Sequence, residues 1–352
     1  MKKTAIVYSP RYLDHDPGPN HYESPRRLRT IIGGLRESGL LEHENCSIIE
    51  PQTASLKDLE LVHSSGYIEF VRKTSESGGG LLAEQTVASR ESFEVARLAA
   101  GGAIDAVNKV MAKDFCNAFA LVRPPGHHAG PDYALGFCLF NNVALAAAHL
   151  LRRYCLNRIL VLDIDAHHGN GTQEIFYDTD KVLYVSLHED PSEFPETGFV
   201  DETGEGTGAG YTVNIPFPYG TGDPAYLKAM KRLVIPIVQQ YKPQFILVSA
   251  GFDGYYKDSI AELSLSAYVY PRIFQMVLDL AHRFCGDRVV AVLEGGYSLP
   301  FLRKIVPSIT AQMAGLNVGV RDRRPLLNWD AQREAEKIIE YVRKVQSCFW
   351  EL

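Results

Sequence analysis

Acidic residues and paired histidines follow an apolar run at residues 159–172, which read ILVLDIDAHHGNGT. If the run is a buried strand, its side-chain period of two turns Asp163, Asp165 and His167 toward the same side as the chain leaves the sheet. Carboxylate oxygen and imidazole nitrogen both bind zinc and similar divalent cations, and a catalytic site needs only three protein ligands with one position left open for water. Asp165 and His167 could therefore share one metal ion, and the segment predicts metal-assisted hydrolysis.

The same segment has a simpler interpretation, a buried strand end with hydrogen-bonded polar residues, because an isolated motif can match by chance. Three other apolar runs favour the metal site, since each also ends in reactive side chains. They are residues 117–130, which carry His127 and His128, residues 245–254, which carry Asp253, and residues 288–298, which carry Tyr297. Ligands of open parallel α/β sheets bind outside the carboxyl ends of the strands. The four runs therefore predict one shared pocket.

Length and composition agree with one globular α/β domain, although they do not decide the fold, and they argue against several other classes of protein. The chain has 352 residues, of which 46% are hydrophobic and 22% charged, so we expect one large core and a single domain over residues 1–352. A net charge of -6 provides no basic surface for nucleic acid. No apolar run is long enough to cross a membrane, and the start, MKKTAIVYSP, has too short an apolar segment for a signal peptide. The six cysteines show no CxxC spacing, which is typical of reduced thiols in a cytoplasmic protein.

Strand and helix patterns alternate along the chain without a long linker or an internal repeat. Ser24 and Pro25 predict a helix start, with a capping residue followed by a first-turn proline. The glycine-rich stretch at residues 198–210 is the longest expected loop, and it is either a surface connection or part of a pocket rim. The other predicted elements are a first strand at residues 4–8 and helices at residues 93–110, 142–154, 224–240 and 330–345.

Eight motifs occur in order between about Ser24 and about Leu316: ESPRRL, RPPGHHAG, GFCLFNNVALAA, DIDAHHGNGTQEIFY, VSLHED, GAGYTVNIP, SAGFDG and LEGGY. In these motifs the sequence resembles the histone deacetylase superfamily, which includes class I and class II lysine deacetylases, acetylpolyamine amidohydrolases and acetoin-utilisation proteins. The resemblance implies an arginase/deacetylase-like α/β fold, with a central parallel sheet flanked by helices and the active site at the C-terminal ends of the strands. It also implies zinc-dependent amide hydrolysis.

Residue by residue, the resemblance implies a mononuclear zinc site made by Asp165, His167 and Asp253. Bound there, zinc would polarise an amide carbonyl and acidify a water molecule. A dinuclear arginase-type site would need another aspartate two positions beyond the ligating histidine. This chain has Gly169 there, so a single metal is favoured.

The resemblance also assigns the groups that would move protons. It implies that His128 is the general base and later the acid that protonates the leaving amine, whereas His127 is mainly an electrostatic partner. Tyr297 would donate its hydroxyl to the developing oxyanion. Asp163 would orient His127, and Asn170 would orient His128. Class I members carry aspartate at the position of Asn170, and because a neutral amide cannot raise an imidazole pKa through charge, we expect His128 to be the less basic of the pair.

Two structural potassium sites are implied by the resemblance alone. The first would use the backbone carbonyls of Asp163, Asp165 and His167 with the Ser186 hydroxyl. The residues of the second would be Phe176, Thr179, Val182 and Tyr211.

An acyl-lysine tunnel needs apolar walls, and the resemblance places them at Gly136, Phe137 and Phe194, with Gly295 of LEGGY also in the substrate-binding set. For each aromatic ring, a place in the core is the alternative.

The remaining histidines divide into two groups. His63, His168 and His188 are interpreted as hydrogen-bonded structural residues, whereas His15 and His21 lie in a rim loop where either could touch substrate.

Two rim positions bear on substrate choice. Polyamine-selective class II relatives place a glutamate seven positions after the ligating aspartate of GFD, where this chain has Ile260, and this argues against that mode of polyamine selection. Glu84 matches an acidic rim residue that holds the substrate backbone in lysine deacetylases. A nearby acidic residue meets the amine in polyamine amidohydrolases, so Glu84 cannot separate the two, and it could equally be a solvated surface carboxylate.

Three functions follow from these residues. The first is a zinc amidohydrolase that removes acetyl or another short acyl group from lysine side chains of a peptide. The second is an acetylpolyamine amidohydrolase acting on a small acylated amine. The third, a catalytically silent acyl-binding protein, is disfavoured because the ligands, the histidine pair and the tyrosine are all present. Neither a nucleic acid nor a membrane is expected as a partner. The sequence leaves open a homo-oligomer, the preferred acyl length, and zinc versus iron.

Overall fold

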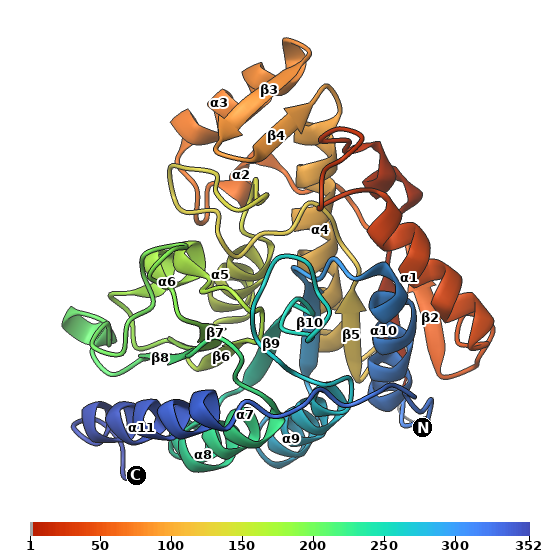
Figure 1. Ribbon diagram of the computed structural model, residues 1–352. Helices are drawn as coiled ribbons and strands as arrows, with labels where there is room; N and C mark the ends of the chain where they lie inside the picture. Colours follow the sequence, from red (N-terminus) through yellow and green to blue (C-terminus); the bar gives the residue numbers. More distant parts are fainter. Residues whose placement is uncertain (1–2) are drawn as a thin grey trace.

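The computed structural model describes residues 3–352, and its centre is an eight-stranded parallel sheet in the order β2-β1-β5-β10-β9-β6-β7-β8 (Figure 1). The strands of this sheet are β1 (Thr4–Val7), β2 (Cys46–Ile49), β5 (Asn117–Ala120), β6 (Ile159–Asp163), β7 (Val182–Glu189), β8 (Thr212–Phe217), β9 (Phe245–Ala250) and β10 (Val289–Leu293). The predicted α/β class with a central parallel sheet is confirmed.

The four central strands are buried along their whole length. Their sequences, NAFA, VVAVL, FILVSA and ILVLD in sheet order, contain no exposed residue. Continuous apolar runs of this kind are typical of parallel strands that are covered by helices on both faces. The four runs that end in reactive side chains are therefore the four adjacent strands β5, β10, β9 and β6.

Helices cover both faces of the sheet (Figure 1). On one face α4, α5 and α6 pack side by side against the strands, and on the other α1, α10 and α9 form a second layer. Their bounds are α1 (Arg26–Glu37), α4 (Ser92–Met111), α5 (Asn142–Tyr154), α6 (Asn170–Phe176), α9 (Val269–Phe284), α10 (Leu299–Met313) and α11 (Trp329–Gln346). Helix α11 runs along the β8 edge, where its apolar stripe packs against β8 and against α7 (Asp223–Ala229).

A small subdomain lies at one end of the molecule, at the top of Figure 1. It consists of α2 (Leu56–Leu59), α3 (Ser65–Glu76) and the antiparallel hairpin of β3 (Gly79–Ala83) and β4 (Thr86–Ser89). Short 3₁₀ turns at Pro10–Asp14 and Gly206–Gly208 complete the fold, and among the described residues no helix is long and apolar enough to span a membrane.

Most predicted helices agree with the structure to within a residue, but the helix expected at residues 224–240 is interrupted. It consists of α7 (Asp223–Ala229), a π-helical turn (Met230–Val234) and α8 (Ile235–Tyr241). Pro236 at the start of α8 explains the interruption, because proline lacks the N–H for the helical ladder and its ring collides with the preceding turn. The predicted cap of α1 is also wrong, since the helix begins at Arg26 after Pro25 and has no side-chain cap.

Candidate active site

Two neighbouring strands bring the predicted metal ligands together. Asp165 and His167 follow β6, and Asp253 follows β9, which pairs directly with β6. One ligand atom from each of the three residues lies within 4.8 Å of the others. The His167 Nδ1 atom is 3.2 Å from Asp253 Oδ2 and 3.4 Å from Asp165 Oδ1. Both aspartates are buried, so the cluster forms the floor of the site.

The chemistry of this cluster fits a divalent cation. Two carboxylates and one imidazole leave a fourth position for water or substrate, as catalytic metal sites require. Burial and the nearby charge of Asp165 raise the pKa of Asp253 to about 7, because two buried carboxylates repel each other without a cation between them. A metal bound by Asp165, His167 and Asp253 would remove that repulsion.

Glycines let the backbone close around the carboxylates. The Gly295 N–H donates to Asp165 Oδ2 at 2.8 Å, and the Ala166 N–H donates to Asp253 Oδ1 at 2.9 Å. A Cβ atom at Gly295 would lie 2.4 Å from Asp253 Oδ2, and one at Gly251 would lie 2.2 Å from Asp165 Oδ2. Gly295, which the sequence placed with the substrate-binding residues, lines the pocket and also positions a ligand carboxylate.

The paired histidines lie on the loop that follows β5, with ring centroids 4.0 Å apart. The Nδ1 atom of His127 is 3.0 Å from Asp163 Oδ2, and that of His128 is 2.8 Å from Asn170 Oδ1. The amide oxygen of Asn170 accepts from His128, so Nδ1 of His128 carries the hydrogen. Both histidines line the pocket, and each has the Nδ1 partner predicted from the sequence.

The two imidazoles differ in basicity. Burial opposes protonation of His127, but the carboxylates of Asp165 and Asp163 outweigh it and raise the pKa of His127 to about 10. Burial, followed by the charges of His127 and His167, lowers the pKa of His128 well below its usual range. His128 is therefore the less basic of the pair, as expected, and a neutral His128 can accept a proton through Nε2.

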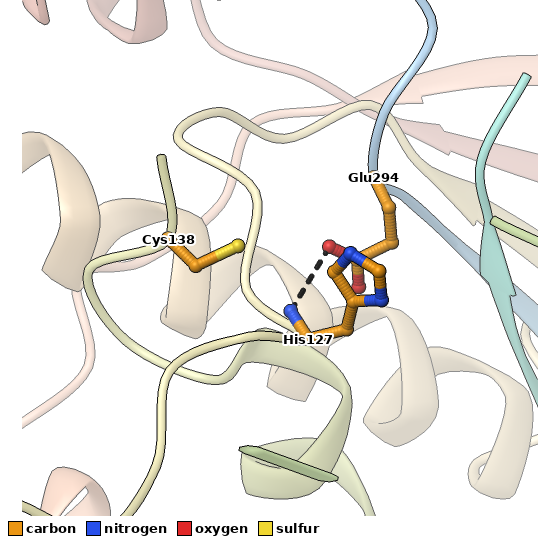
Figure 2. A group of neighbouring side chains, drawn as sticks. All are labelled: His127, Cys138 and Glu294. Atoms are coloured by element: carbon orange, nitrogen blue, oxygen red, sulfur yellow. Dashed lines mark hydrogen bonds between the residues drawn. The ribbon is translucent and has the colours of Figure 1, made fainter. Parts of the chain in front are cut away.

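Figure 2 shows a second group of potential ligands, His127, Cys138 and Glu294, which we interpret as a structural brace. Glu294 Oε2 accepts hydrogen bonds from the N–H groups of Gly126 and His127 at 2.7 and 3.2 Å, and Ser249 donates to Oε1 at 3.2 Å. Burial raises the pKa of the Cys138 thiol well above its usual value, so the thiolate that metals prefer is disfavoured. Glu294 thus fixes the backbone of the histidine loop, a role that the sequence analysis missed although LEGGY contains the residue.

Tyr297 is held by its backbone and its ring, while its hydroxyl is left free. The N–H groups of Tyr297 and Ser298 donate to Asp258 Oδ2 at 2.7 and 2.8 Å. The Arg27 guanidinium lies 5.0 Å from the centroid of the Tyr297 ring and donates to Gly296 O at 2.7 Å. Within residues 3–352 the Tyr297 hydroxyl has no hydrogen-bond partner, and burial raises its pKa well above the usual value. It is therefore protonated and can donate to a ligand.

A buried network of charged side chains holds Arg27, which contacts the Tyr297 ring. Glu23 accepts two hydrogen bonds from Arg123, both at 2.7 Å, and also contacts Arg27 at 3.2 Å. All three side chains are fully buried. The sequence analysis missed these residues, although ESPRRL and RPPGHHAG contain them, because their role depends on contacts between distant segments.

The pocket above the predicted metal ligands has a volume of about 640 Å³, and aromatic rings form part of its wall. The Phe137 ring contacts His21 and Tyr297, with centroids 4.7 and 5.9 Å away, whereas the Phe194 ring contacts His128 at 5.0 Å. Gly136 has φ +51°, and a Cβ atom there would lie 2.3 Å from a ring carbon of His128. Both predicted aromatic walls therefore line the pocket rather than filling the core.

Carboxylates are frequent in the lining of the pocket. Glu84 and Ile260 line it as expected, but five more acidic residues join them: Glu189, Asp190, Glu193, Glu196 and Glu262. No lysine or arginine lines this pocket among the described residues.

Of the two histidines expected at the rim, His21 packs against the Phe137 ring of the pocket wall. His15 is buried and forms a hydrogen bond with Ser92, so the prediction that His15 could touch substrate is wrong.

The histidines interpreted as structural make internal hydrogen bonds. His63 contacts Gly130 O, His168 contacts Thr197 and Gln173, and His188 contacts Ser186 and Gly198 O. None of them lines the pocket. The same is true of residues 198–210, which form a surface connection rather than a rim.

Some of the predicted potassium ligands lie on neighbouring segments. Ser186 on β7 pairs in register with Asp163 on β6. In the second group, the Thr179 N–H donates to Phe176 O at 3.4 Å, and Tyr211 O accepts from the strand that begins at Val182. Potassium binding stays a prediction at both places.

Known proteins that are similar to this chain along most of its length belong to one family. Residues 21–313 match the histone deacetylase domain family. A probable deacetylase of Archaeoglobus fulgidus is 42% identical over 99% of this chain and 98% of its own length. A histone deacetylase-like amidohydrolase of Pseudomonas aeruginosa is 37% identical over 91% of this chain and 88% of its own length. The crystal structure of the HDA15 HD domain matches with a TM-score of 0.88 and 34% identity, covering 99% of this chain and 95% of that chain. The chain therefore belongs to the histone deacetylase family and has its arginase/deacetylase-like fold.

Proposed function

We propose that the protein is a zinc-dependent amidohydrolase that removes acetyl or other short acyl groups from the side-chain amine of lysine. The observation that carries this proposal is the convergence of three metal-ligating residues, two imidazoles of different basicity and one free phenol on a single pocket. Relatives described as deacetylases and as an amidohydrolase support the class of reaction.

A zinc ion held by Asp165, His167 and Asp253 would supply polarisation of the amide carbonyl and a more acidic water molecule. Neutral His128 accepts the proton from the attacking water through Nε2 and later delivers a proton to the leaving amine. His127, paired with Asp163 at 3.0 Å, acts as an electrostatic partner that stabilises the negative charge developing on the substrate.

Tyr297 completes the site with a donor for the developing oxyanion. Its backbone is fixed by Asp258 and its ring by Arg27, so the hydroxyl needs little reorganisation during the reaction. Phe137 and Phe194 enclose the aliphatic stem of the substrate and keep water away from it. An acylated polyamine has a similar stem and is the alternative substrate.

The reaction is tested with a panel of acetylated and longer-acylated lysine peptides and acylated polyamines, assayed with zinc-replete protein. We expect release of the carboxylic acid, complete loss of turnover after chelation, and recovery when zinc is restored. Zinc-replete protein that hydrolyses none of these amides would contradict the proposal. Relative kcat/KM values within the panel identify the preferred amine and acyl group.

The partner of His128 sets the acidic limb of the pH profile. In Asn170→Asp a carboxylate replaces the amide beside His128 Nδ1, and a negative charge there raises the pKa of the imidazole. Since the base must be unprotonated, the acidic limb of kcat/KM is expected to move to higher pH by roughly one unit. Asn157→Asp, an exposed position at the other end of β6, is the control and should leave the profile in place. Identical limbs in wild type and Asn170→Asp would show that Asn170 does not tune this base.

A further inference from the structure

The side-chain amide of Asn170 can prepare His128 as a base only when it faces in one direction. Its Oδ1 atom is 2.8 Å from His128 Nδ1. An asparagine amide accepts through its oxygen and donates through its nitrogen, and the two ends are nearly equal in shape. With the amide reversed, its nitrogen would donate to Nδ1 and the ring hydrogen would lie on Nε2. The imidazole could then not accept a proton from water through Nε2, so the direction of the amide has to be fixed.

The phenol of Tyr133 lies at the nitrogen end of this amide. Asn170 Nδ2 donates to the Tyr133 hydroxyl oxygen at 3.1 Å. The other acceptor near Nδ2 is the His128 carbonyl oxygen, which at 3.5 Å lies at the limit of a hydrogen bond. The tyrosine ring packs closely on the histidine loop, because a Cβ atom at Gly130 would lie 2.3 Å from two of its ring carbons. Tyr133 is therefore the main hydrogen-bond partner of the amide nitrogen.

A carboxylate at the far side of Tyr133 decides which way its hydroxyl points. A hydroxyl can donate as well as accept, so Tyr133 alone could pair with either end of the Asn170 amide. Its hydrogen is given to Glu174 Oε2 at 2.6 Å, and a carboxylate only accepts. Tyr133 therefore presents lone pairs to the amide, and these accept only from the nitrogen. Each donor in the row His128, Asn170, Tyr133 points away from the active site and toward Glu174.

We propose that Tyr133 and Glu174 are positioning residues that fix the direction of the Asn170 amide and thereby keep the ring hydrogen of His128 on Nδ1. The inference rests on the proposed hydrolysis, because it concerns the base of that reaction. Neither residue lines the active-site pocket, and Glu174 is exposed at a separate surface pocket. Both therefore act on the chemistry only through Asn170.

Two substitutions remove this control of direction. Tyr133→Phe keeps the ring and removes its hydroxyl, whereas Glu174→Gln offers Tyr133 both an acceptor and a donor. In zinc-loaded protein we expect kcat to fall about tenfold in Tyr133→Phe and about threefold in Glu174→Gln, as for the loss of one hydrogen bond, with KM unchanged. Asp178→Asn is the control, because Asp178 is exposed, lines the same surface pocket and makes no hydrogen bond to Tyr133 among the described residues. It should leave kcat unchanged.

Two further measurements separate positioning from a general structural effect. The position of the ring hydrogen is read from ¹⁵N NMR of the histidine ring nitrogens, with His128→Ala used to identify the signals. Wild type should carry the hydrogen on Nδ1, and Tyr133→Phe should show a mixture of both forms. A carboxylate at position 170 has no direction to fix, so Tyr133→Phe should change kcat by less than twofold when it is added to Asn170→Asp.

The inference is overturned if Tyr133→Phe keeps the wild-type kcat. It is also overturned if kcat falls while the hydrogen of His128 stays on Nδ1, or if the fall is as large in the Asn170→Asp background. The thermal unfolding midpoint of each variant is measured, and if Tyr133→Phe does not fold, the exposed Glu174→Gln decides by the same criteria. If wild type hydrolyses no amide, the hydrolysis proposal fails, and the NMR comparison still decides whether Tyr133 and Glu174 set the position of the hydrogen.

Discussion

Replacing Asp253 by asparagine is expected to abolish stoichiometric zinc binding and to lower kcat/KM by about a thousandfold or more. In the proposed zinc site Asp253 provides one of the two anionic ligands, and without it the remaining donors of Asp165 and His167 would not neutralise and hold a dication. The loss removes several kcal/mol of charge stabilisation from the transition state, roughly a factor of ten for each 1.4 kcal/mol. Elemental analysis after equilibrium dialysis, together with turnover of an acylated amine, measures both effects.

The stability of the metal-free protein provides the control for this variant. The pKa of Asp253 is raised in the folded state, so the folded protein binds more protons than the unfolded chain between the unfolded value near 4 and the folded value near 7. The free energy of unfolding of metal-free wild type should therefore fall as pH rises through this range. Asp253→Asn lacks that titration and should lose less stability over the same range. A cooperative unfolding transition of the variant at the assay pH would show that its inactivity is not a folding defect. An Asp253→Asn protein that retains zinc and turnover would remove Asp253 from the metal site.

Tyr297→Phe is expected to lower kcat by about a hundredfold to a thousandfold, with little change in zinc content or in KM. Phenylalanine preserves the ring contacts with Phe137 and Arg27 and the backbone hydrogen bond to Asp258. Only the hydroxyl disappears, and in the wild type this group has no partner within the described residues. The whole effect should therefore fall on the transition state, where the oxyanion needs a donor.

Tyr22→Phe is a matched control for that variant. The Tyr22 ring lies 6.4 Å from the Tyr297 ring but is 53% exposed, and it does not line the pocket. Removing its hydroxyl should leave kcat unchanged. Unchanged kcat in Tyr297→Phe itself would exclude Tyr297 from the chemical step, and a parallel loss of zinc would assign it a structural role instead.

Loop bracing explains how distant segments hold the catalytic groups. Glu294 follows β10 and bonds to the backbone of His127, which follows β5, the strand next to β10. Asp258 follows β9 and bonds to the backbone of Tyr297. The backbone of each of these loops therefore donates hydrogen bonds to a carboxylate from a neighbouring loop. These bonds limit the movement of His127 and Tyr297 relative to the predicted metal ligands.

Much of the active site could be predicted from the sequence, because each reactive residue is marked by the residues immediately before it in the chain. Each reactive group directly follows an apolar run, and the chain direction alone places such groups at the carboxyl end of a parallel strand. Asp165, His167, Asp253, the histidine pair and Tyr297 were identified in this way, and eight motifs carried the resemblance to the family, which implied the role of each residue. The helices at residues 93–110 and 142–154 could be predicted for the same reason, because the hydrophobic period and the end signals that define them lie within the segments themselves.

Only the tertiary structure decided which strands are neighbours and which loops meet. The order β5-β10-β9-β6 depends on crossovers between strands far apart in sequence, and no local pattern encodes it. For that reason the sequence did not predict that Glu294 braces His127, that Asp258 holds Tyr297, or that Glu189 and Tyr219 line the same pocket. Side-chain type and local period determined the chemistry available to this protein, whereas packing between strands determined where each charge is buried and what it can bind.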